Sequence, residues 1–124
     1  GLFDTVLVGQ SRAINGITDV VLTKLDVLDE LEEIQVCVGY ETKHKKYNYL
    51  PFDENIQNIL MPIYETIPGW QESTFGLTSW DDLPKKAQNY ISFLESKIQK
   101  NISIISTGPD RAHTIDRNNL LGNN

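Results

Sequence analysis

The stretch Val20-Val21-Leu22-Thr23-Lys24-Leu25-Asp26 joins an apolar run directly to a short polar turn. The apolar residues follow one another without a break, instead of alternating with polar ones. Continuous apolarity is typical of a strand that is covered on both faces, as in a parallel sheet. We therefore predict a buried strand over residues 19–22, with the polar turn at its carboxyl end.

A second stretch near the other end of the chain has the same arrangement. Ile102-Ser103-Ile104-Ile105 leads into the polar loop Ser106-Thr107-Gly108-Pro109. A helical pattern over about residues 83–100, with Pro84 in its first turn, comes directly before it. The apolar stripe of this helix consists of Ala87, Tyr90, Ile91, Leu94 and Ile98. Because ligands collect at the carboxyl ends of strands in open α/β sheets, we expect the two polar loops to lie together there.

The remaining segments complete an α/β pattern. Residues 34–40 alternate between apolar and polar side chains, which predicts a strand with one solvent-facing side, and residues 47–50 are predicted to return as its hairpin partner. Further predictions are a helix over 4–15, a short helix capped by Asp53 with Ile56, Ile59 and Leu60 facing inward, and a proline-punctuated extended segment over 61–70. The predicted fold class is α/β: part of a mostly parallel sheet with flanking helices and an attached antiparallel hairpin.

The composition limits the classes of function that this chain can have. A chain of 124 residues that is 40% hydrophobic and 23% charged fits one folded domain. A net charge of −6 argues against nucleic acid or an anionic membrane surface as a partner. The single cysteine, Cys37, excludes an internal disulfide framework and favours a reducing compartment such as the cytoplasm.

The first polar loop carries groups that can recognise a guanine base. Guanine presents two hydrogen-bond donors, N1–H and the 2-amino group, beside its O6 acceptor. The carboxylate of Asp26 can accept from both donors, whereas adenine would leave it unpaired at a cost of roughly 1–3 kcal/mol or more. Lys24 can lay its methylene stem along the base, and Leu25 between them is expected to pack inward.

The second loop can supply the other wall of such a site. Backbone N–H groups of Ser106, Thr107 and Gly108 can donate to O6, while Gly108 permits a close backbone approach and Pro109 stiffens the exit. Each loop also has a simpler interpretation. Asp26 can be the cap of an ordinary strand-end turn, and residues 106–109 can be an ordinary turn. The chain contains no G-x-x-x-x-G-K-[ST] phosphate-binding loop, so the pattern predicts a base site without a phosphate site.

Other candidate residues have structural interpretations. His44 and His113 are expected at the surface, and Glu30, Glu32 and Glu33 are expected to form a solvated face. Cys37 is expected to pack or to face solvent. Trp70 and Phe75 are interpreted as core residues and not as a ligand platform. Asp110 and Arg111 are expected to pair with each other or with a neighbouring segment.

Blocks of sequence across nearly the whole chain resemble the adenylosuccinate synthetase family. Their order and approximate spacing match, whereas residues 41–60 and the last residues are unspecific. The two most specific blocks are the one that contains Thr23-Lys24-Leu25-Asp26-Val27-Leu28-Asp29 and the one that contains Pro68-Gly69-Trp70. The matching blocks are Gly1-Leu2-Phe3-Asp4, Leu22-Thr23-Lys24-Leu25-Asp26-Val27-Leu28-Asp29, Cys37-Val38-Gly39-Tyr40, Pro62-Ile63-Tyr64-Glu65, Pro68-Gly69-Trp70-Gln71-Glu72-Ser73-Thr74-Phe75-Gly76 and Ile104-Ile105-Ser106-Thr107-Gly108-Pro109-Asp110-Arg111.

The resemblance implies a ligase that joins inosine monophosphate (IMP) and L-aspartate, using GTP and Mg²⁺, in AMP biosynthesis. GTP phosphorylates the 6-oxygen of IMP, and the amino group of aspartate then displaces that phosphate. The family fold implied is a P-loop NTPase-like variant, here lacking the P-loop itself. Such enzymes are implied to be cytoplasmic homodimers. The GTP-binding set implied for this chain is Lys24, Leu25, Asp26, Ser106, Thr107 and Gly108, with Pro109 as a neighbour.

The resemblance covers roughly the last quarter or third of the enzyme. Residues 1–117 are expected to form the C-terminal guanine-nucleotide-binding segment, and residues 118–124 a frayed tail. The family's phosphate loop, catalytic aspartate and histidine, magnesium ligands and most IMP contacts belong to the part that precedes it. We therefore expect no catalytic and no metal-binding residue in this chain, and no synthetase activity from it alone. The alternative is a non-catalytic structural module that binds no ligand in isolation.

Overall fold

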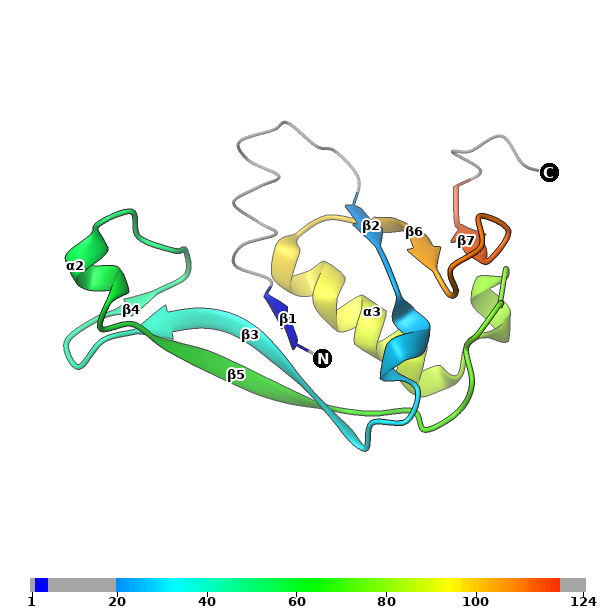
Figure 1. Ribbon diagram of the computed structural model, residues 1–124, viewed down its shortest axis with the longest axis horizontal. Coiled ribbons are helices and arrows are strands. Elements are labelled where there is room, and N and C mark those ends of the chain that lie inside the picture. The colour runs from blue at the N-terminus through cyan, green and yellow to red at the C-terminus, as the bar shows by residue number, and fades with distance from the viewer. Residues whose placement is uncertain (1, 5–19, 119–124) are drawn as a thin grey trace.

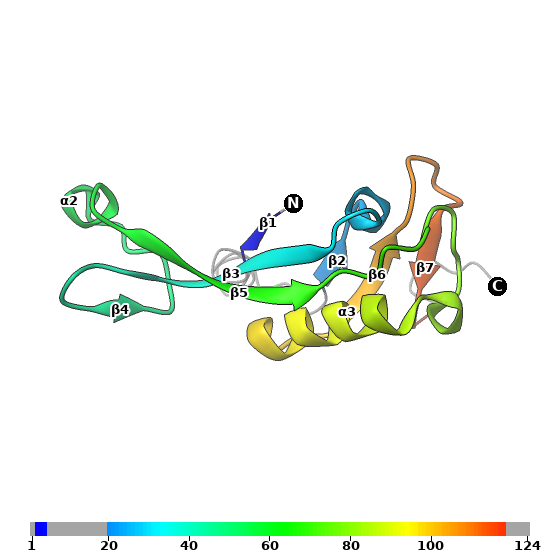
Figure 2. The same ribbon diagram turned by 90° about the horizontal axis from the view of Figure 1, so that it is seen from below.

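A computed structural model describes residues 2–4 and 20–118 (Figure 1). The predicted helix over 4–15 and most of the predicted frayed tail lie outside these residues. Two small sheets and one long helix make up the α/β architecture (Figures 1 and 2). The elements in chain order are β1 Leu2–Asp4, β2 Val20–Leu22, the 3₁₀ helix η1 Leu25–Leu28, β3 Glu33–Glu41, β4 Lys46–Tyr47, α2 Glu54–Gln57, β5 Met61–Pro68, the 3₁₀ helix η2 Trp80–Asp82, α3 Lys85–Ile98, β6 Ile102–Ser106 and β7 Thr114–Asp116.

The first sheet contains the two strands that were predicted from continuous apolar runs. β2 and β6 pair in parallel, with Leu22 opposite Ile105, and β7 pairs antiparallel to the other edge of β6. Ile102 and Ile105 are fully buried, as expected for a covered strand. Val21, however, is 56% exposed, so the prediction that the first strand is covered on both faces is wrong. Its neighbour Leu22, 6% exposed, belongs to the core, so adjacent residues of this strand differ strongly in burial.

The second sheet is centred on β3. β1 lies parallel to β3, whereas β4 and β5 are both antiparallel to it. Of the five strand pairings within the described ranges, two are parallel and three antiparallel, so both sheets are mixed where a mostly parallel sheet was expected. The difference comes from β7 in the first sheet and, in the second, from the proline-containing segment, which forms the regular strand β5. Its prolines, Pro62 and Pro68, are tolerated because β5 forms a sheet edge, where β3 is its one pairing partner among the described residues.

The far ends of β3 and β5, together with β4 and α2, form an arm that extends away from α3 (Figures 1 and 2). The predicted hairpin partner of β3 is the short strand β4, which pairs only at Tyr40 and Glu41. Asp53 caps α2 as predicted, since its carboxylate accepts from the Asn55 N–H at 2.9 Å. Ile59 is 62% exposed, so its predicted inward position is wrong, because the tip of the arm is far from the core.

The core lies where α3 packs against both sheets. The predicted apolar stripe of α3 is confirmed, since all five of its residues are buried. α3 begins one residue after Pro84, which occupies the N-cap position, and it is followed by the C-cap residue Gln99 in the left-handed region with φ of 56°. Trp70 joins the core from the segment after β5, where its ring centroid lies 5.5 Å from that of Tyr90. The segment that follows β5 is therefore anchored to the centre of the molecule.

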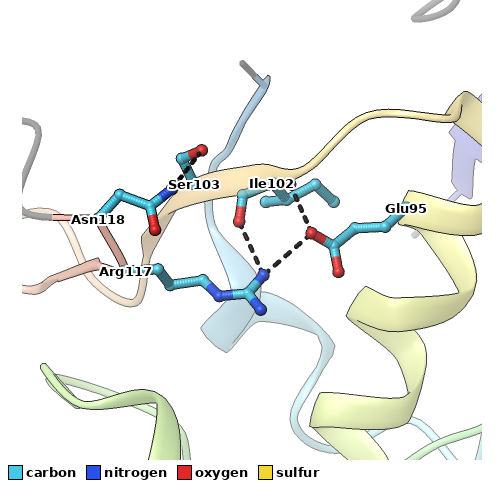
Figure 3. A network of polar contacts seen from close by, with 5 residues as sticks. All are labelled: Glu95, Ile102, Ser103, Arg117 and Asn118. Carbon is cyan, nitrogen blue, oxygen red and sulfur yellow. Dashed lines mark hydrogen bonds and ion pairs between the residues drawn. The ribbon is translucent and has the colours of Figure 1, made fainter.

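Polar contacts fix the beginning of β6 against the end of α3 (Figure 3). One oxygen of Glu95 accepts from the Ile102 N–H at 2.7 Å and from Arg117 Nη1 at 3.0 Å. The same arginine nitrogen donates to the Ile102 carbonyl oxygen at 2.9 Å, and its guanidinium carbon lies 4.0 Å from the centre of the Trp80 ring. Asn118 donates to the Ser103 hydroxyl at 3.3 Å. These bonds fix the first residues of β6 against the C-terminal end of α3. They thereby also help to position the loop that follows β6.

Tyr90 makes the stability of the fold sensitive to alkaline pH. Burial raises the pKa of its phenol to about 12, whereas a solvated tyrosine titrates near pH 10. Because the folded pKa is the higher one, its contribution is complete below about pH 10 and is lost as pH rises towards 12. We expect a loss of about 3 kcal/mol in the free energy of unfolding across this interval. Urea unfolding at a series of pH values measures it.

Two variants isolate that effect. Tyr90→Phe is expected to flatten the stability profile between pH 10 and 12, because it removes the titrating group. Tyr64→Phe, at a position that is 42% exposed, serves as the matched control and is expected to keep the wild-type slope. Equal slopes for wild type and Tyr90→Phe would contradict the prediction.

Candidate guanine-recognition site

The two polar loops leave the same edge of one sheet. Leu22 and Ile105 are partners in the parallel ladder, so the chain leaves β2 and β6 at neighbouring positions. In Figure 2, η1 and the β6–β7 connection lie together, and β2 and β6 lie between them and α3. η1 also contacts β6 directly. The expected meeting of the two loops at the carboxyl ends of adjacent parallel strands is therefore what the structure has.

The first loop places its three predicted residues in three environments. Lys24 lies in the left-handed region, with φ of 60° and ψ of 42°, and begins η1 with its side chain exposed. Leu25 is 1% exposed and packs in the core, as predicted. Asp26 is half-buried and lines a cavity of about 640 Å³. The left-handed turn at Lys24 thus separates an inward leucine from a carboxylate that faces a cavity.

The Asp26 side chain is not the cap that the simpler interpretation suggested. Across residues 20–118, no hydrogen bond or ion pair engages its carboxylate, while its backbone carbonyl accepts from the Asp29 N–H at 3.2 Å. Asp29 makes the structural bonds instead. It accepts from Trp70 Nε1 at 2.8 Å and from both the N–H and the hydroxyl of Thr74 at 2.7 Å. One acid of the turn is therefore committed to the protein, and the other is open to a ligand.

The wall opposite Asp26 comes from the segment after β5, not from the second loop. The cavity lies between η1 and this segment, and residues 106–109 do not line it. Acidic side chains make up much of its polar lining. The lining residues are Asp26, Val27, Asp29, Glu30, Gln71, Glu72, Ser73 and Phe75.

The second loop is held by its own hydrogen bonds. Thr107 is fully buried, its hydroxyl donates to the Leu77 carbonyl at 2.8 Å, and its N–H donates to the His113 carbonyl at 2.8 Å. The expectation that this N–H faces the base is therefore wrong. The Ser106 hydroxyl donates to the Gly108 carbonyl at 3.1 Å, and Pro109 is exposed. Ser106 is the last residue of β6, so its N–H belongs to the ladder with β2, and the Gly108 N–H is the donor of this loop that remains a candidate for a ligand within the described residues.

Gly108 accommodates a histidine. A Cβ at this position would lie 2.3 Å from His113 Nδ1, so the close approach that glycine permits is to this ring. His113 is half-buried, and its ring centroid lies 4.9 Å from that of Phe75. Phe75 is 55% exposed and lines the Asp26 cavity, so its interpretation as a core residue is wrong, whereas that of Trp70, 4% exposed, is confirmed. The surface position expected for His113 is only partly correct.

Sequence reasoning missed Asp29, Thr74 and Gly76. Asp29 and Thr74 are 45 positions apart, so no local periodicity or spacing connects them. Their only signal was membership of the two most specific sequence blocks. Within the described ranges, no three His, Cys, Asp or Glu side chains are arranged to hold a metal ion, and no helix is long and apolar enough to cross a membrane.

Comparison with known proteins identifies the family. A family model described as adenylosuccinate synthetase matches residues 1–115. The chain belongs to the adenylosuccinate synthetase family. The resemblance of its sequence blocks is thereby confirmed.

Adenylosuccinate synthetases from two bacteria are close relatives. That of Coxiella burnetii (strain Dugway 5J108-111) is 49% identical over 117 residues, covering 94% of this chain. That of Ehrlichia canis (strain Jake) is 49% identical over 119 residues, covering 96%. The structure of the fully ligated adenylosuccinate synthetase from Plasmodium falciparum is similar to this fold, with a TM-score of 0.84 and 34% identity over 92% of this chain. The chain spans 27% or 28% of the length of these three proteins.

Proposed function

We propose that this chain supplies the guanine-recognition loops of a GTP-dependent ligase that forms adenylosuccinate from IMP and L-aspartate. One observation carries the proposal: Asp26 lies in the turn that follows β2, a strand parallel to β6, and its carboxylate lines a cavity without a protein partner in the described ranges. The family relationship supports the assignment. The GTP-binding set is Lys24, Leu25, Asp26, Ser106, Thr107, Gly108 and Pro109.

The proposed selectivity rests on hydrogen-bond donors. The Asp26 carboxylate accepts from N1–H and the 2-amino group of guanine, two donors that adenine does not present together. Bonds to an ionised acceptor contribute roughly 1.5–3 kcal/mol each, so replacing guanine with adenine weakens binding by at least about tenfold. Lys24 begins the same turn and is exposed, which leaves its methylene stem free to cover one face of the base.

The second loop has divided roles in this proposal. The Gly108 N–H donates to O6 of the base, and Ser106, the last residue of β6, positions the start of the loop. Thr107 acts through its backbone position alone, because its side chain and its N–H bond within the protein. Pro109 is exposed beside Gly108 and borders the base. Leu25 likewise contributes by packing, since it anchors the first loop in the core.

The other requirements of the reaction are assigned to parts of the longer relatives that this chain does not match. The described residues hold no acidic group arranged as a metal site, so no step is assigned here to Mg²⁺. Binding of IMP, L-aspartate and the phosphates of GTP belongs to the same unmatched parts. We propose that the ligase acts in the cytoplasm as a homodimer, and that this chain alone does not catalyse the reaction.

One observation favours the alternative, a non-catalytic assembly module that binds no ligand by itself. Phe52, Ile59 and Met61 lie around the tip of the arm and are 87%, 62% and 63% exposed. Large apolar side chains that are exposed together mark a surface that another part of a protein covers. The two proposals differ in whether the isolated chain binds a nucleotide.

An NMR amide titration of the chain with GDP, ADP and xanthosine diphosphate (XDP) decides between them. We expect GDP to shift the amides of residues 23–26 and 106–109, and ADP to leave them unchanged. Asp26→Asn is expected to weaken GDP binding by roughly tenfold or more and to favour XDP, because an amide can donate to the additional oxygen of xanthine. The absence of any selective shift would overturn guanine binding by this chain and support the assembly module.

The matched control is Asp81→Asn. Asp81 is exposed and lies in the 3₁₀ helix η2, so this variant removes the same charge from the same type of helix at another position. We expect the control to bind GDP, ADP and XDP like the wild type. A change in nucleotide preference in this variant as well would indicate a general charge effect, and it would contradict the role assigned to Asp26.

A further inference from the structure

Residues 70–77, which we term the brace, connect the two loops that the proposed function assigns to the base. At one end, the Asp29 carboxylate accepts three hydrogen bonds: one from Trp70 Nε1 at 2.8 Å, and two from Thr74 at 2.7 Å. Trp70 is 4% exposed and Thr74 is fully buried. Hydrogen bonds to a buried or half-buried carboxylate are strong and directional, so this end of the brace is fixed to η1.

The other end of the brace is fixed to the second loop. The Gly76 N–H donates to the Thr107 carbonyl at 3.1 Å, and the Thr107 hydroxyl donates to the Leu77 carbonyl at 2.8 Å. Phe75, between the two ends, packs its ring against that of His113, with centroids 4.9 Å apart. The brace therefore makes a continuous path from η1 to the loop after β6.

We propose that Asp29 is a positioning residue, which acts through the brace to set the spacing between the Asp26 turn and the 106–109 loop. Asp29 and Asp26 belong to the same 3₁₀ turn, where the Asp29 N–H donates to the Asp26 carbonyl at 3.2 Å. The carboxylate that holds the brace is thus rigidly connected to the carboxylate that faces the cavity. This inference rests on the proposed function, because the spacing matters only if both loops contact one base.

The parallel ladder alone does not fix this spacing. β2 has only three residues, and its pairing with β6 is irregular between Val20 and Val21. The brace adds a second connection at the end of the ladder where the loops begin. Because a base-recognition site must be held within a fraction of an ångström, releasing one end of the brace is expected to weaken binding without changing which base is preferred.

The test is Asp29→Asn in the full chain, with GDP and XDP as probes. The amide keeps one acceptor oxygen but presents an NH₂ group where the carboxylate accepted, so it cannot make all three bonds. We expect GDP binding to weaken about tenfold, while the preference for GDP over XDP stays that of the wild type. Asp26→Asn is expected to change that preference, which separates positioning from direct recognition.

Hydrogen exchange gives a readout that does not depend on ligand binding. We expect Asp29→Asn to accelerate amide exchange at Thr74 and Gly76, and to leave Val36 in the middle of β3 unchanged. Faster exchange at Thr74 alone would overturn the proposal, because Asp29 would then not act as far as the second loop. Unchanged GDP binding with accelerated exchange at both sites would overturn it equally.

Two further variants keep the result interpretable. Glu32→Gln removes an exposed charge three positions away and is expected to match the wild type in binding and exchange. Thr74→Val removes one of the three hydrogen bonds to Asp29. We expect it to weaken GDP binding and to accelerate amide exchange less than Asp29→Asn does. It serves as the test if Asp29→Asn does not fold. If the wild-type chain binds no GDP, the proposed function fails for the isolated chain, and the exchange data alone decide whether the brace connects the loops.

Discussion

Gly69→Ala is expected to destabilise the fold by about 4 kcal/mol, above the usual range for an added methyl group. A Cβ at this position would lie 1.8 Å from the Leu31 carbonyl oxygen and 2.8 Å from its carbonyl carbon. These are backbone atoms, so no side-chain rotation relieves the overlap. The Gly69 N–H also donates to the Glu32 carbonyl at 2.8 Å, and this bond must lengthen if the strands separate. Urea unfolding followed by circular dichroism measures the loss.

Gly76→Ala is the matched control for this prediction. The added Cβ would be 3.7 Å from the nearest atom, an ordinary contact, but φ of 77° is unfavourable for alanine. We expect a cost of about 1 kcal/mol, from the backbone conformation alone. Equal destabilisation by the two variants would contradict the steric argument at Gly69. The larger effect at Gly69 would show that two backbones are in direct contact at the residue that precedes the brace.

Much of the fold was predictable because its signals are local. The periodicity of residues 34–40 predicts β3, and the apolar stripe of α3 is buried in full. The two apolar runs predict β2 and β6, and the α-to-β step predicts that they belong to one sheet. The direction of the strands, and whether β5 is a strand at all, were harder to predict from the sequence. β5 was interpreted only as an extended segment, because Pro62 and Pro68 argue against a strand unless one edge is known to be free.

The candidate site was predictable in part for the same reason. Asp26 and Lys24 were selected because the chemistry of guanine requires such side chains at the end of a strand. Asp29 was not selected, because its partners lie far along the chain and become neighbours only through the pairing of β3 with β5. Phe75 and Thr107 illustrate the opposite error. An aromatic residue was assigned to the core and a backbone N–H to the ligand, and in both cases tertiary contacts decided otherwise.

Trp70→Ala is expected to reduce the free energy of unfolding by about 4–5 kcal/mol, which is a large fraction of the roughly 5–15 kcal/mol that is typical of a domain. The indole is 4% exposed and packs against Tyr90, so its removal leaves a cavity in the core. It also donates to Asp29 at 2.8 Å, and its loss would leave that acceptor one bond short. Circular dichroism during urea unfolding measures this change without relying on the fluorescence of the deleted side chain.

Trp70→Phe separates the two contributions. It keeps an aromatic ring in the core but removes the N–H donor to Asp29. We expect it to cost about 1–2 kcal/mol, for one hydrogen bond to a carboxylate and a small loss of volume. If Trp70→Phe were as destabilising as Trp70→Ala, the hydrogen bond and not the packing would dominate. A much smaller loss for Trp70→Phe would place most of the stabilisation in the core, with the bond to Asp29 serving to orient the brace that leaves it.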